Sequence, residues 1–379
     1  MERRTFIKSS GLGSLPFLTP LLPLMGAAVS HPAAVPAVNF VAAGELLNTQ
    51  QYAEKLQQIG QTTPIEQDAF GNGGCVTALE EKFEQLTGKE KAIFMPTGTM
   101  ANQLAMKVLS GQQTKVLVME NSHYYRDEAD AASTLHNKRL IPLGKENYRF
   151  PLDELKAAIE YYKEGEYFPS GVGAMAVEIP VRRNDNRMMS YREFEQISEY
   201  CRAQQIPLHL DGARIFMASA WSGIPVSAYA ALADTIYISL YKYLGAASGA
   251  MLCGKKEVIS QMPRLIKIHG GSMYRNWTNA AMVLHGIDGF MDRLAKARQQ
   301  GDALIAMLNR LPQFRITPAK DGTCVYPMEL KGVDATVFKK GMAAQGIRAV
   351  ASELIINETI LYRDNNDLFN AFKKAAGIA

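Results

Sequence analysis

Along this chain, segments with helical spacing of apolar residues alternate with short, continuous apolar runs. Residues 77–86 and 98–109 repeat apolar side chains at helical spacing, which predicts helices with one buried face. Short apolar runs at residues 115–119 and 207–210 instead predict buried strands. The same reasoning predicts further strands at residues 92–95, 173–179 and 235–239 and further helices at residues 153–162 and 191–204. Strands separated by such helices indicate an α/β fold with a mainly parallel sheet that is covered on both faces.

The last part of the chain predicts a smaller α/β domain. A helical pattern extends over residues 280–311 and is followed by shorter elements. Strands are expected at residues 324–329 and 348–350, and helices at residues 335–344 and 367–375. We therefore expect an N-terminal segment at residues 31–60, a large domain at residues 61–290 and a small domain at residues 291–379.

The first 30 residues predict an export signal. A basic start with Arg3, Arg4 and Lys8 precedes an apolar run that reaches Val29. The paired arginines are typical of a twin-arginine signal peptide at residues 1–30, and an ordinary secretory signal or an uncleaved anchor is the alternative. We expect a periplasmic protein. Because no later segment has 18 uninterrupted apolar residues, we expect the mature chain to be soluble and not bound to a membrane.

Composition and charge exclude several classes of protein. The chain has 379 residues, of which 47% are hydrophobic and 21% charged, with a formal net charge of +4. This is globular composition, and it gives no reason to expect nucleic acid as a partner. The four cysteines form no CxxC or CxxH pair, so we expect no structural metal site and favour buried free thiols over disulfides.

Two charged side chains stand where chemistry is expected. Asp211 ends a buried strand and is followed by Gly212, which places its carboxylate at the edge where ligands bind to such sheets. Lys242 follows another apolar strand and is flanked by aromatic and small residues. A desolvated Lys has a lowered pKa and can form an imine. Taken singly, Asp211 also suits a helix N-cap, and Lys242 also suits a surface loop.

Two further segments are candidates for binding a ligand. Residues 96–102 connect a strand to a helix, and the helical amides that follow Gly98, with the hydroxyl of Thr99, suit a phosphate. A capped turn is the alternative there. His123 follows the strand at residues 115–119, so its ring reaches the same edge and could stack on a planar cofactor, although a lone His is more often structural.

Together these segments resemble the threonine aldolase and aromatic amino acid β-eliminating lyase family of fold-type I pyridoxal 5'-phosphate (PLP) enzymes. The likeness extends from about residue 68 to residue 289, and the spacing of 31 positions from Asp211 to Lys242 matches the family. The segments that carry it are residues 68–72, 94–105, 122–123, 126–129, 177–178, 209–214, 242–246 and 270–273.

The resemblance implies a role for each candidate. Lys242 would hold PLP as an imine and move protons, and Asp211 would hold the pyridinium nitrogen. His123 would stack on the ring and serve as a base, and Arg214 would bind the substrate carboxylate. The phosphate ligands would be Gly98, Thr99 and, from across a subunit interface, Arg275. The family also implies a homodimer or homotetramer acting on a small amino acid.

The substrate end departs from the family. The early segment that carries hydroxyls in the family corresponds to residues 40–45, which have none, and Ile355 or Ile356 stands near the place of a C-terminal Arg. Arg348 and Arg363 are candidate substitutes. We expect an amino-acid lyase most like threonine aldolase, which makes glycine and an aldehyde. One alternative is β-elimination from a Cys, Ser or aromatic amino acid, because Tyr241 and Tyr243 are expected to enlarge the apolar wall beside Lys242. The other is a PLP-fold binding protein without turnover.

Overall fold

The computed structural model describes residues 37–378, so the predicted signal peptide lies outside the described residues. Within that range, no helix combines the length and apolar character that a membrane crossing needs.

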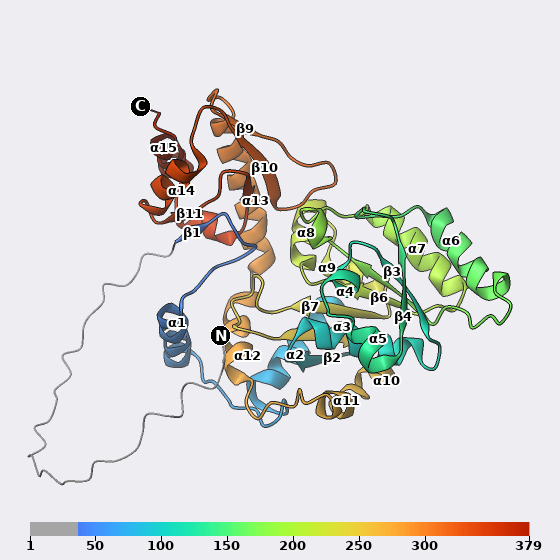
Figure 1. Cartoon of the computed structure of the whole chain (residues 1–379). Helices are drawn as coiled ribbons and strands as arrows, with labels where there is room; N and C mark the ends of the chain where they lie inside the picture. The colour runs from blue at the N-terminus through green and yellow to red at the C-terminus, as the bar shows by residue number, and fades with distance from the viewer. Residues whose placement is uncertain (1–36, 379) are drawn as a thin grey trace, which may run out of the picture. The chain divides into compact units, whose positions relative to one another are not determined.

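A seven-stranded sheet forms the centre of the larger part of the described chain (Figure 1). β8 is antiparallel to both of its neighbours, and the other strands run parallel to one another. The prediction of a mainly parallel sheet is therefore confirmed. In spatial order the strands are β2 (Lys91–Met95), β8 (Ala250–Gly254), β7 (Thr235–Ser239), β6 (Leu208–Asp211), β5 (Ala174–Glu178), β3 (Lys115–Met119) and β4 (Arg139–Leu143).

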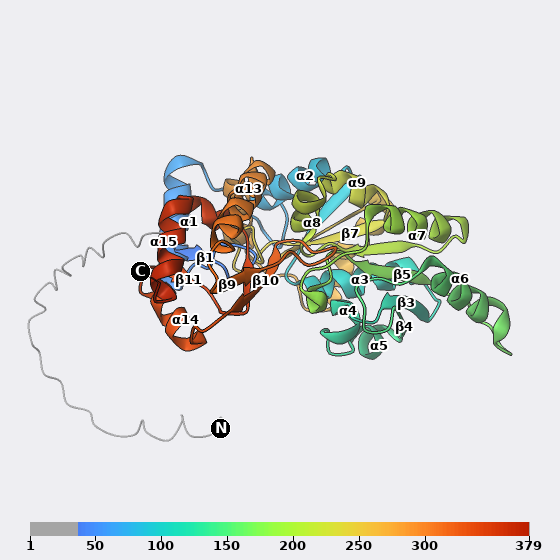
Figure 2. The same ribbon diagram turned by 90° about the horizontal axis from the view of Figure 1, so that it is seen from above.

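Helices cover both faces of this sheet (Figure 2). Side chains alternate across it: Leu117 and Met119 of β3 belong to the core on one face, and Val116 and Val118 to the core on the other. The first face carries α2 (Gly74–Thr87), α6 (Leu152–Glu160), α7 (Tyr191–Ala203), α8 (Ile215–Ser222) and α9 (Val226–Ala231). The second carries α3 (Gly98–Ser110), α4 (His123–Arg126), α5 (Ala131–His136), α10 (Lys256–Ile259) and α11 (Met262–Ile268).

The long helix expected over residues 280–311 is two helices, so that prediction was wrong. α12 (Trp277–Ile287) ends before Asp288, and α13 (Phe290–Leu308) begins after Gly289. Gly289 has a φ of 66°, a left-handed conformation that ends a helix and is easy only for glycine. Phe290 and Leu294 pack in the core of the large sheet, whereas α13 from Ala297 to Leu308 packs in a second core.

The second core lies around a small antiparallel sheet near the C-terminus. Its strand order is β12 (Glu353–Ile355), β10 (Val325–Leu330) and β9 (Phe314–Ile316), and α14 (Ala335–Ala343) and α15 (Asn365–Ala375) pack with it. A two-residue strand from the N-terminal segment, β1 (Val38–Asn39), pairs in parallel with β11 (Ile347–Arg348). Residues from both ends of the described chain therefore meet in the C-terminal part. The predicted domain boundary at residue 290 stays a prediction.

Several elements were not foreseen. The apolar pattern gave no prediction for the strands β4 and β8 or for the helix α1 (Thr49–Thr62). β4 contains Pro142 and lies at an edge of the sheet, where a residue without an N–H is tolerated. All four cysteines are buried and free, as expected.

Candidate active site

The predicted site residues meet at one edge of the large sheet. Asp211 ends β6 and pairs in register with Glu178, which ends β5. Lys242 follows the end of β7, and His123 follows the end of β3 at the start of α4. Because these strands are parallel, their carboxyl ends share one edge, which is where doubly wound sheets bind ligands.

Asp211 is fixed by hydrogen bonds. Its Oδ1 accepts a bond from the backbone N–H of Ala213 (3.1 Å), and its Oδ2 accepts one from Asn102 Nδ2 (2.9 Å). Asn102 comes from α3 and is fully buried. His209 Nε2 lies 2.9 Å from Asn102 Oδ1, and His209 Nδ1 lies 2.8 Å from the hydroxyl of Thr235. Two layers of side chains thus hold the carboxylate of Asp211 in place.

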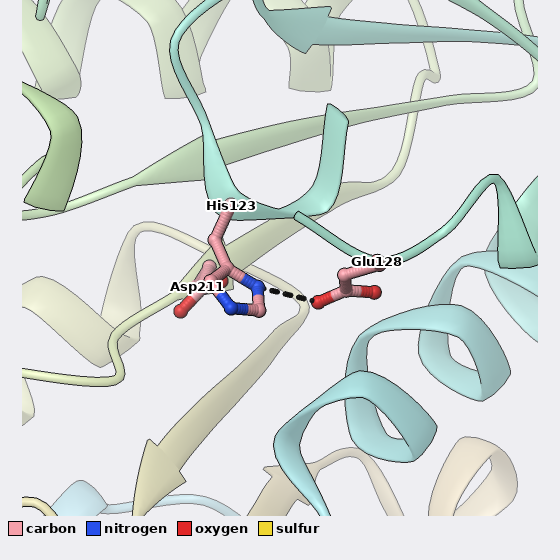
Figure 3. A group of neighbouring side chains, drawn as sticks. All are labelled: His123, Glu128 and Asp211. Carbon is pink, nitrogen blue, oxygen red and sulfur yellow. Dashed lines mark hydrogen bonds and ion pairs between the residues drawn. The ribbon is translucent and has the colours of Figure 1, made fainter. Parts of the chain in front are cut away.

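His123 is held from two directions. Its backbone N–H donates to Glu178 Oε2 (2.6 Å), and its Nδ1 lies 2.9 Å from Glu128 Oε1. Figure 3 shows the ring of His123 turned toward Glu128, with Asp211 close by. The hydrogen bond to Glu128, which is the largest influence, raises the pKa of His123.

Ligand atoms of His123, Glu128 and Asp211 lie within 4.8 Å of one another, a spacing that a metal ion could use. Asn102 Nδ2 already donates to both carboxylates. One oxygen of each carboxylate is therefore engaged with a hydrogen-bond donor, and the predicted absence of a metal stays a prediction.

Glu178 joins the walls of the site. Besides His123, its carboxylate accepts a bond from the backbone N–H of Arg182 (2.9 Å). Burial, followed by the neighbouring charge of Asp211, raises the pKa of Glu178 to about 7. This residue therefore fixes two backbone segments at the edge of the sheet.

Lys242 is set among aromatic rings and opposing charges. Its Nζ lies 5.9 Å from the ring centroid of Tyr237 and 5.8 Å from that of Tyr241. Burial first, and the charge of Arg214 second, lower the pKa of Lys242 to about 8, although Asp211 counteracts this. Roughly a tenth of the amine is neutral at pH 7 as a result, far more than for an ordinary lysine, and the neutral amine is the form that makes an imine.

The segment at residues 96–102 has the geometry expected of an anion site. Thr97 caps α3, and its hydroxyl accepts a bond from the N–H of Met100 (3.1 Å). The backbone N–H groups of Gly98 and Thr99 donate to no acceptor among residues 37–378. A side chain on Gly98 would meet the hydroxyl of Tyr237 at 2.0 Å, so the tight approach to Tyr237 is a second reason for glycine at this position.

Arg214 stands on the substrate side without a carboxylate partner in the described part of the chain. It is partly buried at the start of α8, and it lowers the pKa of Lys242 by its charge. A guanidinium in this position is available for the carboxylate of a ligand.

The N-terminal segment reaches this side of the site. Asn357 Nδ2 donates to the carbonyls of Asn39 (2.6 Å) and Ala42 (2.9 Å). A Cβ on Gly44 would lie 2.5 Å from Cα of Tyr243 and 3.2 Å from the carbonyl oxygen of Lys242. Gly44 therefore lies beside Lys242, and the segment at residues 40–45 offers no hydroxyl there.

The arginine substitutes proposed from the sequence are engaged elsewhere. Arg363 donates to the carbonyl of Gln345 and pairs with Asp367 in the C-terminal part. Arg348 donates to the carbonyl of Leu46 (3.2 Å). Ile356 is fully buried, so the position near the family's C-terminal Arg is part of a core.

Within the described chain, Arg275 forms no hydrogen bond or ion pair with Lys242. It donates to the carbonyl of Asp68 and stacks on the ring of Tyr274 at 4.2 Å. Its predicted role as a phosphate ligand from across an interface stays a prediction.

Sequence reasoning missed Asn102 and Glu128 as site residues, and it misjudged Tyr243. Asn102 and Glu128 had been noted only as parts of matching segments. Tyr243 was expected to line the cavity near Lys242, but it is buried and packs between Phe216 and Phe290 at 5.6 and 5.8 Å. The sequence held a signal for this: adjacent residues of an extended segment point to opposite sides, so Lys242 and Tyr243 should not both face the cavity.

Comparisons with known proteins agree with this geometry. The family model described as beta-eliminating lyase matches residues 49–327, about three quarters of the chain. The chain is 25% identical over 323 residues to low-specificity L-threonine aldolase 1 of Arabidopsis thaliana, covering 82% of this chain and 89% of that protein. It is 27% identical over 294 residues to the low specificity L-threonine aldolase of Escherichia coli strain K12, covering 77% and 85%.

A solved structure from Exiguobacterium sp. 255-15, named for the aromatic amino acid beta-eliminating lyase/threonine aldolase group, has a similar fold. The TM-score is 0.76 at 23% identity, and the match covers 90% of this chain and 97% of that one. The predicted fold-type I arrangement, with a large sheet domain and a small C-terminal sheet, is confirmed.

Proposed function

The chain belongs to the beta-eliminating lyase family, and from that premise we propose that it is a PLP-dependent lyase that cleaves a β-hydroxy amino acid to glycine and an aldehyde. The observation that carries this proposal is the meeting of Lys242, Asp211 and His123 at one edge of the sheet. Relatives named threonine aldolase support the type of reaction.

The described residues fit PLP. Lys242 offers an amine whose pKa is lowered to about 8, and Asp211 offers a buried carboxylate suited to a protonated ring nitrogen. The unpaired amides of Gly98 and Thr99 at the start of α3 suit its phosphate. We propose these four residues as the ligands of the cofactor.

When bound, PLP supplies an electron sink for the bond that breaks at the substrate α-carbon. The side chains of this chain would position and deprotonate the substrate. Arg214 would hold the carboxylate through its guanidinium. His123 Nε2 has no partner in the described part of the chain, because the hydrogen bond to Glu128 uses Nδ1, so Nε2 would take the proton of the β-hydroxyl group.

β-Elimination from a Cys, Ser or aromatic amino acid is a second candidate, and Tyr241 favours it. Tyr241 is 48% exposed and lines a cavity of about 410 Å³ with Leu46, Leu47 and Tyr52. Because Lys242 Nζ lies 5.8 Å from the Tyr241 ring, this apolar cavity could receive a large leaving group.

We also propose that the protein is exported to the periplasm and acts as a homodimer or homotetramer. The paired Arg3 and Arg4 before an apolar run support export. Exposed Phe70 and Tyr274 lie beside Arg275, with a ring-centroid distance of 5.2 Å, and an apolar pair of this kind supports contact with a second copy.

The test is a product assay on the purified protein with added PLP. Threonine and phenylserine would be offered in one set, and cysteine, serine and tyrosine in another. Glycine together with an aldehyde is the expected result. A keto acid with ammonia would instead favour β-elimination. A protein that binds PLP and changes its absorption with amino acids, yet releases no product, would overturn both and leave a binding protein.

A further inference from the structure

Glu128 is a buried carboxyl group at the centre of the site. It is 4% exposed. Its Oε1 lies 2.9 Å from His123 Nδ1 and 2.8 Å from Asn102 Nδ2, and its Oε2 has no hydrogen-bond partner among residues 37–378. Burying a carboxylate is costly unless its partners compensate, so its two donors are what make this position tolerable.

The orientation of Asn102 follows from its neighbours. The nitrogen Nδ2 faces Glu128 Oε1 and Asp211 Oδ2 and donates one hydrogen to each. The oxygen Oδ1 therefore faces His209 Nε2 and must accept a hydrogen from it. Burial lowers the pKa of His209 to about 4, so its ring is neutral and carries that single hydrogen on Nε2. One amide thus ties together the two carboxyl groups beside His123.

The proton position on His123 follows in the same way. Burial, the largest influence, raises the pKa of Glu128, and its hydrogen bonds to His123 and Asn102 counteract this. When Glu128 is ionised its Oε1 can only accept, so His123 Nδ1 must carry the hydrogen between them. The backbone N–H of His123 is held separately by Glu178. His123 Nε2 is left as the nitrogen that is free to exchange a proton.

We infer that Glu128, oriented by Asn102, is the positioning residue that keeps the proton of His123 on Nδ1, so that proton exchange with a substrate takes place at Nε2. Through Asn102 the same arrangement sets the orientation of Asp211 relative to His123. This inference goes beyond the proposed reaction: its catalytic meaning rests on the role proposed for His123, but the hydrogen-bond arrangement can be measured without any turnover.

The charges around His123 favour its protonated form on balance. The carboxyl groups that face the ring or its backbone come from the segment after α4 (Asp127 and Glu128), from β5 (Glu178) and from β6 (Asp211). Lys242 faces the ring from the segment after β7. Of these, the hydrogen bond to Glu128 contributes most to raising the pKa of His123, and burial opposes it. Removing the charge of Glu128 should therefore move the titration of His123 to lower pH.

The experiment is nitrogen-15 NMR of the imidazole rings in the full chain, with and without PLP. The chain has six histidines, and the His123→Asn variant identifies the signals of His123. Glu128→Gln keeps an oxygen that accepts from Nδ1 but removes the charge, and Glu128→Ala removes both. Asn102→Ala removes the orienting amide. Glu120→Gln is the matched control, because Glu120 pairs with Arg126 and makes no recorded contact with the His123 ring.

We expect the Nδ1–H tautomer in the unaltered chain. Glu128→Gln should keep that tautomer while the midpoint of the His123 titration falls, and Glu128→Ala and Asn102→Ala should give a mixture of tautomers. Glu120→Gln should change neither. In the loaded enzyme, Glu128→Gln should lower kcat about ten-fold or more with little change in KM, and the cofactor should remain bound.

The inference is overturned if His123 carries its proton on Nε2 in the unaltered chain, or if neither Glu128→Gln nor Asn102→Ala changes its signals. These outcomes are separate from failure of the proposed reaction. A chain that cleaves no amino acid but shows the Nδ1–H tautomer and its loss in Glu128→Ala would keep the inference and reject the reaction. Circular dichroism of each variant distinguishes a local change from unfolding.

Discussion

The two sides of the candidate site are held in different ways. On the side formed by α3 and β6, hydrogen bonds join Asp211 to Asn102 and Asn102 to both Glu128 and His209. On the opposite side, Arg214 has no carboxylate partner in the described chain, and Gly44 of the N-terminal segment lies next to Lys242.

Under the proposed function, the first side would orient the cofactor and the second would bind the substrate. Groups that orient a cofactor must be held rigidly, and buried networks in which every donor has an acceptor provide that rigidity. A substrate-binding side with fewer fixed partners allows the ligand to differ from that of the relatives named threonine aldolase. The departure at residues 40–45 falls on this side, where Gly44 approaches Lys242, whereas Ile356 packs in the second core.

The largest expected effect is that of Lys242→Ala on the rigid side. Without the amine, PLP has no covalent attachment, so the visible absorption band that borohydride bleaches should disappear and turnover should fall by at least about a thousand-fold. Absorption spectra before and after borohydride measure this. Lys267→Ala, which removes a lysine beside Phe70, should keep the band. A bleachable band in Lys242→Ala would place the attachment at another lysine.

The next effect concerns the stability of the same side at low pH. Histidine in an unfolded chain titrates near 6.5, and burial lowers the pKa of His209 to about 4. Between these values the unfolded chain takes up a proton that the folded chain does not. The stability present above pH 6.5 should therefore fall by about 3 kcal/mol as the pH drops to 4.

Urea unfolding at several pH values measures this loss. His209→Gln should flatten the dependence in that window, whereas His285→Gln, which alters an exposed ring, should leave the slope unchanged. The same slope in His209→Gln and the unaltered chain would show that other groups cause the acid sensitivity.

On the substrate side, Arg214→Gln should raise KM about ten- to a hundred-fold, because a charged hydrogen bond to a carboxylate contributes about 1.5–3 kcal/mol. The cofactor spectrum should not change. Steady-state kinetics measure the effect. Arg363→Gln serves as the control, since its side chain bonds to the carbonyl of Gln345 and pairs with Asp367 in the C-terminal part. A rise in KM in this control comparable to that in Arg214→Gln would reassign the carboxylate ligand.

The smallest expected effect is on stability, and it tests whether the close approach of Gly44 to Tyr243 and Lys242 requires a glycine. Gly44→Ala should destabilise the fold by about 1–3 kcal/mol, because the added Cβ would lie 2.5 Å from Cα of Tyr243. Gly60→Ala in α1 is the control, since its Cβ would meet only a methyl group of Ile65 at 3.7 Å and alanine favours helix. Thermal melting of Gly44→Ala and Gly60→Ala measures the difference. Equal melting temperatures for the two variants would contradict the close approach of Gly44 to Tyr243.

Local patterns predicted much of the large sheet. The strands at residues 115–119 and 235–239 begin and end where the apolar runs do, because a buried strand needs apolar side chains on both faces. The helix pattern over residues 280–311 failed at Gly289, since spacing alone does not reveal a left-handed φ. β8 was missed because its small residues carry little strand signal.

The sequence by itself determined which residues end the strands and which side chains could bind PLP, so Lys242, Asp211 and His123 were expected at one edge. Only the tertiary structure decided how they are held. Asn102 contacts His209 across 107 positions and Asp211 across 109, and Tyr243 turns into the core beside Lys242. Periodicity is a property of neighbouring residues, whereas these contacts depend on strand order and helix packing, which no local pattern contains.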